Sequence, residues 1–99
     1  MKKIVLVCAG GMSTGVLVNN MKQAAQKKAI PVSIDAFSIE SVASVAKDAD
    51  CMLLGPQVSY RLAEVQGLVA CPTASIDMRT YGMMDGQKAL EQALELIGE

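Results

Sequence analysis

Histidine is absent from this 99-residue chain, and its absence excludes several kinds of site. Without an imidazole the chain has no Cys–His pair, no Ser–His–Asp triad, no histidine metal ligand and no phosphohistidine of its own. Any base or donor histidine in its chemistry must therefore come from a partner. Tryptophan is also absent, and the only aromatic residues are Phe37, Tyr60 and Tyr81. The core must consequently be built from aliphatic side chains and methionine.

Long apolar runs and basic clusters are lacking too. No run approaches the length of a membrane span, and the N-terminus has no signal-peptide pattern, so we expect a cytoplasmic protein without direct membrane insertion. The net charge is −1 and basic residues never cluster beyond a pair, which argues against a nucleic-acid partner. The three cysteines, Cys8, Cys51 and Cys71, contain no C-x-x-C pair and should be thiols. The sequence predicts no metal site and no cofactor.

The apolar residues that are present form a repeating pattern. About half of the chain is apolar, enough for the core of one domain spanning residues 1–99. Apolar runs at 3–8 and 51–54 predict strands buried on both faces, and weaker runs at 32–37 and 73–76 predict edge strands. Helical spacing follows each strand, with the helices predicted from Ser13 or Thr14 as N-cap to about Lys28, after Ser38, over 58–69, and up to Gly98.

This alternation of strands and helices predicts an α/β fold. The expected architecture is a four-stranded parallel sheet in the order 2-1-3-4, with helices on both faces. The loops after strands 1 and 3 then meet at the switch point, where such sheets bind ligands. These loops are Cys8–Gly15 and Gly55–Gln57.

The segment Cys8-Ala9-Gly10-Gly11-Met12-Ser13-Thr14-Gly15 is the candidate site. Cys8 ends the first strand, and the glycine-rich turn after it leads into a helix N-terminus. Turn amides and the helix dipole together favour an anion, and the same field favours negative charge on a cysteine sulfur. We therefore expect Cys8 as the catalytic nucleophile, in a loop that holds a phosphoryl group.

Named phosphate loops fit this segment only in part. It departs from G-x-G-x-x-G, and Val16 stands where a Walker A loop needs lysine. The cysteine-phosphatase pattern C-x5-R is closer, but Thr14 replaces the arginine that would stabilise the transition state. Such a loop is expected to accept and hold a phosphoryl group without hydrolysing it quickly.

Three segments together resemble enzyme IIB of the lactose/cellobiose (chitobiose) class of the bacterial sugar phosphotransferase system. They are Cys8–Thr14, Asp50 with Leu53-Leu54-Gly55-Pro56-Gln57, and Tyr81-Gly82-Met83-Met84-Asp85-Gly86. The resemblance covers nearly the whole chain, with Gly10 as a conservative departure from the usual serine or alanine. It implies a four-stranded parallel sheet with a phosphatase-like phosphate loop.

The resemblance also implies a function. Cys8 would accept phosphate from a phosphohistidine of the IIA protein and pass it to a sugar, a β-linked disaccharide, held by the IIC membrane permease. Backbone amides from Ala9 to Gly15, with the hydroxyls of Ser13 and Thr14, would compensate the phosphate charge. At this stage we expect Gln57 and Tyr81 as accessory residues.

Several other side chains are also assigned positions or roles. Met12, with Met83 or Met84, is interpreted as an apolar patch that meets IIA and IIC. Arg79 is expected in the loop before the last helix, within reach of the site. Arg61, the other arginine of the chain, is expected on a solvated helix face. Cys51 is expected in the core and Cys71 in a loop without a role.

Two other functions remain open on the residues alone. The first is a cysteine phosphatase or arsenate-reductase-like enzyme, which Thr14 argues against. The second is a non-catalytic flavodoxin-like binding module, which would tolerate loss of the Cys8 thiol. The sequence names neither the sugar nor the oligomeric state.

Overall fold

The protein is a layered α/β structure around one parallel sheet. A computed structural model describes residues 1–8 and 13–98, with the side chains of residues 13 and 14 left out. The sheet has the order β2-β1-β3-β4, as predicted. Its strands are β1 (Lys2–Cys8), β2 (Val32–Ser38), β3 (Cys51–Leu54) and β4 (Thr73–Ser75).

The two central strands are buried on both faces. Ile4 to Val7 of β1 and all four residues of β3 are at most 1% exposed, because each strand is an uninterrupted apolar run covered by helices. The parallel register pairs Ile4 with Cys51 on one side of β1, and Cys8 with Ser38 on the other. This register brings the carboxyl ends of β1, β2 and β3 to one edge of the sheet.

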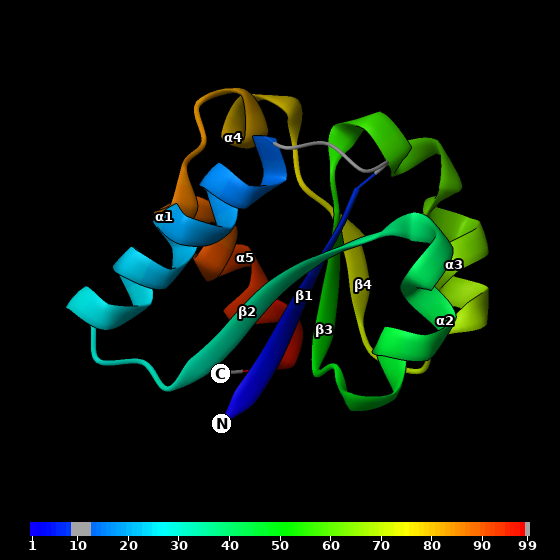
Figure 1. The fold of residues 1–99 in the computed structure, drawn as a ribbon, viewed down its shortest axis with the longest axis horizontal. Helices are drawn as coiled ribbons and strands as arrows, with labels where there is room; N and C mark the ends of the chain where they lie inside the picture. The colour runs from blue at the N-terminus through cyan, green and yellow to red at the C-terminus, as the bar shows by residue number, and fades with distance from the viewer. Residues whose placement is uncertain (9–12, 99) are drawn as a thin grey trace.

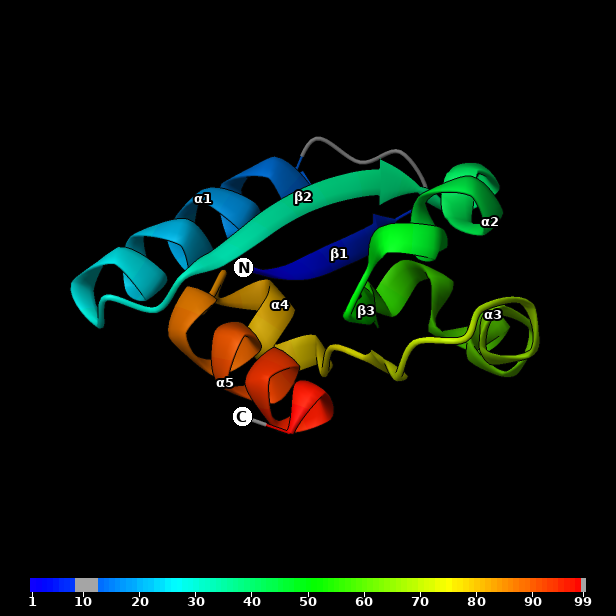
Figure 2. The ribbon, with the colours of Figure 1, turned by 90° about the horizontal axis from the view of Figure 1, so that it is seen from below.

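Helices cover the sheet in two groups (Figures 1 and 2). α1 (Ser13–Lys27), α4 (Met78–Gly82) and α5 (Gly86–Ile97) lie on one side, and α2 (Val42–Val45) and α3 (Leu62–Leu68) lie on the other. The alternating side chains of the strands divide accordingly. Ile4 and Leu6 pack with the α1 and α5 side chains, whereas Val5 and Val7 pack toward α2 and α3.

Two predicted helices differ from their expected form. The helix expected over 58–69 is split into a 3₁₀ segment (Pro56–Arg61) and α3, and Val69 is extended beyond its end. Leu68, an apolar residue within the helix predicted over 58–69, is 58% exposed. Val65 in the middle of α3 is fully buried, whereas Leu68 is the last helical residue, where the chain turns to the extended Val69.

Helix ends were predicted less accurately than helix positions. α1 begins at Ser13, so Ser13 and Thr14 are its first helical residues and neither is its N-cap. Ser38 does precede a 3₁₀ turn, but its side chain makes no capping hydrogen bond. The predicted C-terminal stop is confirmed, because Gly98 ends α5 with a φ of 91°, a conformation that glycine adopts without a Cβ penalty.

The described helices include none that is both long enough and apolar enough to span a bilayer. The longest of them, α1, is amphipathic, with Leu17, Met21 and Ala25 buried and lysines on its outer face. The helices therefore contribute their apolar faces to the two layers of core.

Replacing Leu53 with alanine should destabilise the fold strongly. The Leu53 side chain is fully buried in the layer between β3, α1 and α5, and a cavity there should lower the free energy of unfolding by about 2–5 kcal/mol. Leu68→Ala on exposed α3 is the matched control and should change it by less than about 0.5 kcal/mol. Urea denaturation followed by circular dichroism measures both, and equal losses would contradict this division of the core.

Candidate functional site

Cys8 lies where β1 ends, at the edge of the sheet to which the carboxyl ends converge. Its side chain is 6% exposed, and the Sγ–H donates a weak hydrogen bond to the Phe37 carbonyl oxygen at 3.9 Å. On the neighbouring strand, Ser38 is its paired residue. By the alternation of β1, Cys8 is on the same face as Leu6, the face that α1 covers.

Gly55 borders the end of β1 from the other side. Its N–H donates to the Val7 carbonyl at 2.9 Å, which extends the β1–β3 pairing one residue beyond Leu54. A methyl group on Gly55 would lie 3.0 Å from Gln57 Oε1 and 3.6 Å from Tyr81 Cε2. Both predicted accessory side chains therefore gather beside Gly55, next to the strand that ends in Cys8.

The short helix α4 holds Tyr81 in this position. The Asp77 carboxylate accepts a hydrogen bond from the Thr80 N–H at 2.7 Å and so caps the first turn. Hydrogen bonds from Thr80 lower the pKa of the Asp77 carboxyl, so the cap is charged at neutral pH. Tyr81 follows directly and is 8% exposed.

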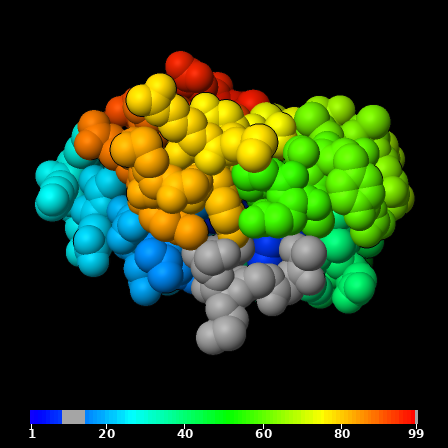
Figure 3. Space-filling model, turned by 90° about the horizontal axis from the view of Figure 1, so that it is seen from above, coloured from blue at the N-terminus to red at the C-terminus, as the bar shows by residue number. Residues whose placement is uncertain are grey.

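The predicted phosphate loop is described only in its second part. Ala9, Gly10, Gly11 and Met12 lie outside the described residues. Ser13, Thr14 and Gly15 form the first turn of α1, which begins five positions after Cys8 in the chain. In the space-filling view of this face, dark-blue atoms of β1 are visible beside the green segment that follows β3 (Figure 3).

Arg61, at the end of the 3₁₀ segment after β3, is paired with a neighbouring carboxylate. Arg61 donates from Nε and Nη2 to the two carboxylate oxygens of Glu64, at 3.2 and 2.7 Å. This ion pair with one partner occupies the fork of its guanidinium. Arg79 is exposed on α4. Among the described residues, no three metal-ligating side chains cluster together.

Comparison with known proteins identifies the family. Residues 3–92 match the sequence model of the phosphotransferase system (PTS) lactose/cellobiose-specific IIB subunit. The chain belongs to this IIB family.

Relatives of this IIB chain align over almost its full length. The oligo-beta-mannoside-specific EIIB component of Bacillus subtilis is 42% identical over 98% of this chain and 97% of its own. The cellobiose-specific EIIB component of Lactococcus lactis is 36% identical over 97% of this chain and 96% of its own. The lactose-specific EIICB component of Staphylococcus epidermidis matches 64% of this chain at 29% identity, within 11% of its own length.

Solved structures agree with this fold. The cellobiose-specific IIB component of Borrelia burgdorferi superimposes with a TM-score of 0.84 at 33% identity, over 98% of this chain and 92% of its own. The lactose-specific IIB domain of Streptococcus pneumoniae gives a TM-score of 0.85 at 20% identity, over 95% of each chain, and shows the fold alone. The chain is accordingly a phosphotransferase-system protein, as the sequence resemblance indicated.

The other two cysteines of the IIB chain lie at the opposite edge of the sheet. Cys51 begins β3 and is completely buried, and burial, with Cys71 and Asp50 nearby, raises its pKa to about 12. Cys71 is half-buried before β4, and burial raises its pKa as well. Both thiols are therefore poor nucleophiles, and neither is near the carboxyl end of β1.

The sequence analysis missed the contribution of β2 to this site. Ser38 was considered only as a helix cap, yet the register makes it the direct neighbour of Cys8. Its Oγ lies 3.4 Å from Ser41 Oγ, so two hydroxyl groups stand at this corner of the site. The alternating pattern of residues 32–37 predicts the strand, and the register of the sheet then places the next residue, Ser38, beside Cys8.

Removing the Asp77 carboxylate should destabilise α4 in a pH-dependent way. The folded-state pKa of Asp77 lies below its ordinary 3.8, so its stabilising effect is complete above that value and is lost as pH falls through the lowered pKa. Asp77→Ala should therefore lower the urea midpoint at neutral pH, and the difference from the parent protein should vanish in strong acid. Asp35→Ala, on an exposed edge of β2, is the control. A difference that persists unchanged to the acid limit would contradict the charged cap.

Proposed function

We propose that Cys8 is the residue that carries the phosphoryl group in this IIB protein. The observation that supports this most directly is its place: of the three cysteines, only Cys8 stands at the carboxyl edge of the sheet, beside Gly55, Gln57 and Tyr81. Open parallel sheets bind ligands at this edge. Cys51 and Cys71 are at the other edge and have raised pKa values.

The proposed chemistry has two transfers at one sulfur. The Cys8 thiol breaks its hydrogen bond to the Phe37 carbonyl and loses its proton to water, and the thiolate attacks phosphorus. An S–P bond forms, and the P–N bond to a phosphohistidine of IIA breaks, with the electron pair going to the histidine nitrogen. A sugar hydroxyl then attacks the same phosphorus and loses its proton to water or a base of the permease, and the S–P bond breaks to return the thiolate.

Backbone groups are proposed to bind the phosphoryl oxygens. The N-terminus of the 15-residue helix α1 follows Cys8 closely, and its free N–H groups and dipole favour an anion there. We assign phosphate contacts to the segment from Ala9 to Gly15, including the Ser13 and Thr14 hydroxyls. Gln57 and Tyr81 are proposed as accessory residues because both side chains border Gly55.

Rapid hydrolysis of the phosphocysteine is not expected. A phosphatase would need a bidentate cation on the phosphate, and Thr14 takes the position of that arginine in the sequence. Arg61 is held by Glu64. These observations favour a carrier over a phosphatase or arsenate-reductase-like enzyme.

The proposed partners are a IIA phosphodonor and a IIC permease. Relatives that join IIC and IIB in one EIICB chain support the second of these. We propose that residues 1–99 act as one IIB domain in the cytoplasm and reach the membrane through IIC. Relatives are named for oligo-beta-mannosides, cellobiose and lactose, so a β-linked sugar is the proposed acceptor.

Intact-protein mass spectrometry tests the assignment of Cys8. The chain is incubated with phosphoenolpyruvate, enzyme I, HPr and candidate IIA proteins. One added phosphoryl group is expected on the parent chain and on the Cys71→Ser control, and none on Cys8→Ser. Iodine, which cleaves a thiophosphate ester, should remove the group.

Any of three results would overturn this proposal. Phosphorylation of Cys8→Ser at the parent level would place the phosphoryl group elsewhere. No phosphorylation of the parent chain by any of several IIA proteins would favour a binding module instead, and release of p-nitrophenol from p-nitrophenyl phosphate would favour a phosphatase.

An apolar patch beside the site is proposed to meet IIA. Met83 is 67% exposed at the end of α4, whereas Met84 packs partly against the core and so does not join the patch. Met12, the other proposed member, lies outside the described residues. A methionine surface adapts to partners of different shape.

Charge in this patch should weaken docking rather than chemistry. Met83→Asp is expected to raise the KM for phospho-IIA about tenfold and leave kcat within about twofold, because it removes contact common to the ground and transition states. Leu68→Asp on the far side, on α3, is the control and should change neither constant. An unchanged KM for Met83→Asp in rapid-quench kinetics would contradict a role of this patch in docking IIA.

A further inference from the structure

The turn that follows Tyr81, up to Gly86, has a backbone conformation and contacts that play no part in the proposed chemistry. The Asp85 N–H bonds to the Thr80 carbonyl at 2.9 Å and the Met84 N–H to the Tyr81 carbonyl at 3.0 Å, which together form a Schellman stop at the end of α4. Met84 occupies the left-handed position with a φ of 51°. A side chain is strained there, and glycine is the usual residue, so something outside the turn must hold Met84 in place.

Asn20 of α1 supplies that contact. Its Nδ2 donates to the Met84 carbonyl oxygen at 2.9 Å, across 64 positions of the sequence. The hydrogen bond is partly buried and fixes the strained turn directly to the middle of α1.

Gly86 brings the two helices together at the same point. A methyl group on Gly86 would lie 2.5 Å from the Met21 nitrogen and 2.6 Å from the Asn20 carbonyl oxygen. These are backbone atoms of a helix and cannot turn aside, so any side chain at this position would push α5 away from α1. The glycine thus permits backbone contact between α1 and the start of α5.

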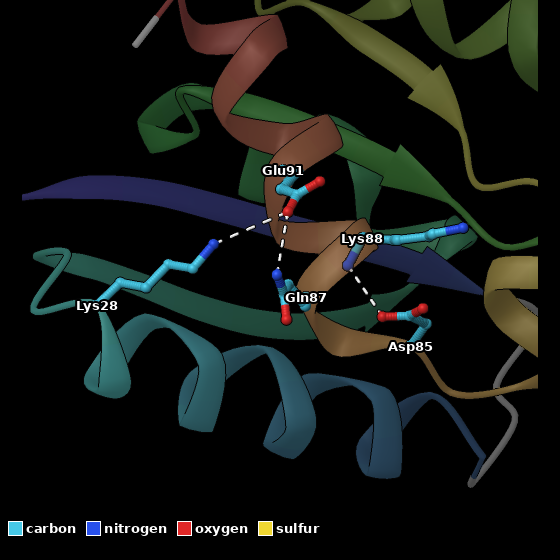
Figure 4. A network of polar contacts seen from close by, with 5 residues as sticks. All are labelled: Lys28, Asp85, Gln87, Lys88 and Glu91. Atoms are coloured by element: carbon cyan, nitrogen blue, oxygen red, sulfur yellow. Dashed lines mark hydrogen bonds and ion pairs between the residues drawn. The ribbon is translucent and has the colours of Figure 1, made fainter.

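Polar contacts along α5 continue this alignment (Figure 4). The Asp85 carboxylate accepts from the Lys88 N–H at 3.1 Å and caps α5, and Lys28 at the end of α1 reaches Glu91 at 3.8 Å. The close-up shows α5 lying across α1, with Asp85 at its beginning and the Lys28–Glu91 pair further along it. The tight contact at Gly86 is therefore at the end of α5 that leads back to α4.

We infer that Asn20, Met84 and Gly86 form a positioning clamp that sets α1 against α4 for phosphoryl transfer. The inference deepens the proposed function and rests on it. Asn20 is seven residues from the start of α1, about 10 Å along its axis. On the other side of the clamp, Tyr81 begins the turn that Asn20 holds, and its ring borders Gly55. The clamp thus joins the helix that follows the cysteine loop to the residues on the β3 side of the site.

Asn20→Ala is the informative variant, and Gln66→Ala is its matched control. The Gln66 Nε2 also donates to a backbone carbonyl, that of Thr73, at 2.9 Å, but it does so between α3 and β4, remote from Cys8. Gly86→Ala and Gly67→Ala form a second pair, since a methyl group on Gly67 meets no atom within 4 Å. Urea denaturation establishes that each variant is folded under the assay conditions.

Rapid-quench transfer from phospho-IIA is the first measurement. Asn20→Ala is expected to lower kcat about tenfold and leave the KM for phospho-IIA within about twofold, because misplaced groups slow the chemical step without removing partner contacts. Gln66→Ala should retain the parent kcat. Equal kcat values for Asn20→Ala and Gln66→Ala would overturn the clamp.

A second measurement needs no phosphodonor. In two-dimensional NMR spectra, Asn20→Ala should shift the backbone amides of Gly15 and Gly55, and Gln66→Ala should leave them in place. If the parent chain is not phosphorylated by any IIA protein, the proposed function fails, and these two resonances still test the clamp. Unmoved Gly15 and Gly55 amides in Asn20→Ala would overturn it on their own.

Discussion

The structure depends on the complete burial of β1. Its residues Ile4 to Val7 present apolar side chains to both faces, and only a central strand with helices on each side removes both faces from water. That requirement places β1 between β2 and β3, and the parallel register then brings Ser38 and Gly55 to either side of Cys8. The place of Cys8 at the carboxyl edge of the sheet is thus a consequence of how the core is built.

The position of a cysteine along its strand decides the surroundings of its thiol. Cys51, at the amino end of β3, is enclosed in the core, where burial raises its pKa to about 12. Cys8, at the carboxyl end of β1, precedes α1 in the chain, and a helix N-terminus favours an anion. Arg61, the arginine that follows β3, is paired with Glu64.

The segment from Tyr81 to Gly86, one of the three that resemble the IIB family, acts largely through packing. Gly86 is needed where the backbones of α1 and α5 touch. Met84, in the left-handed conformation, is held by the side-chain amide of Asn20 on α1. Only Tyr81 reaches the neighbourhood of Gly55. The family motif thus combines one side chain at the site with a turn that determines where that side chain lies.

Local sequence was sufficient for the strand order and the helix-forming segments, because apolar periodicity is encoded by neighbouring residues. It failed at Leu68, which is exposed because α3 ends there and the chain becomes extended at Val69. It also gave no sign of the contact between Asn20 and the turn before Gly86. Such a contact joins residues 64 positions apart, and its existence depends on the distance between two helix axes. That distance is decided by the packing of both helices on the sheet, which only the tertiary structure contains.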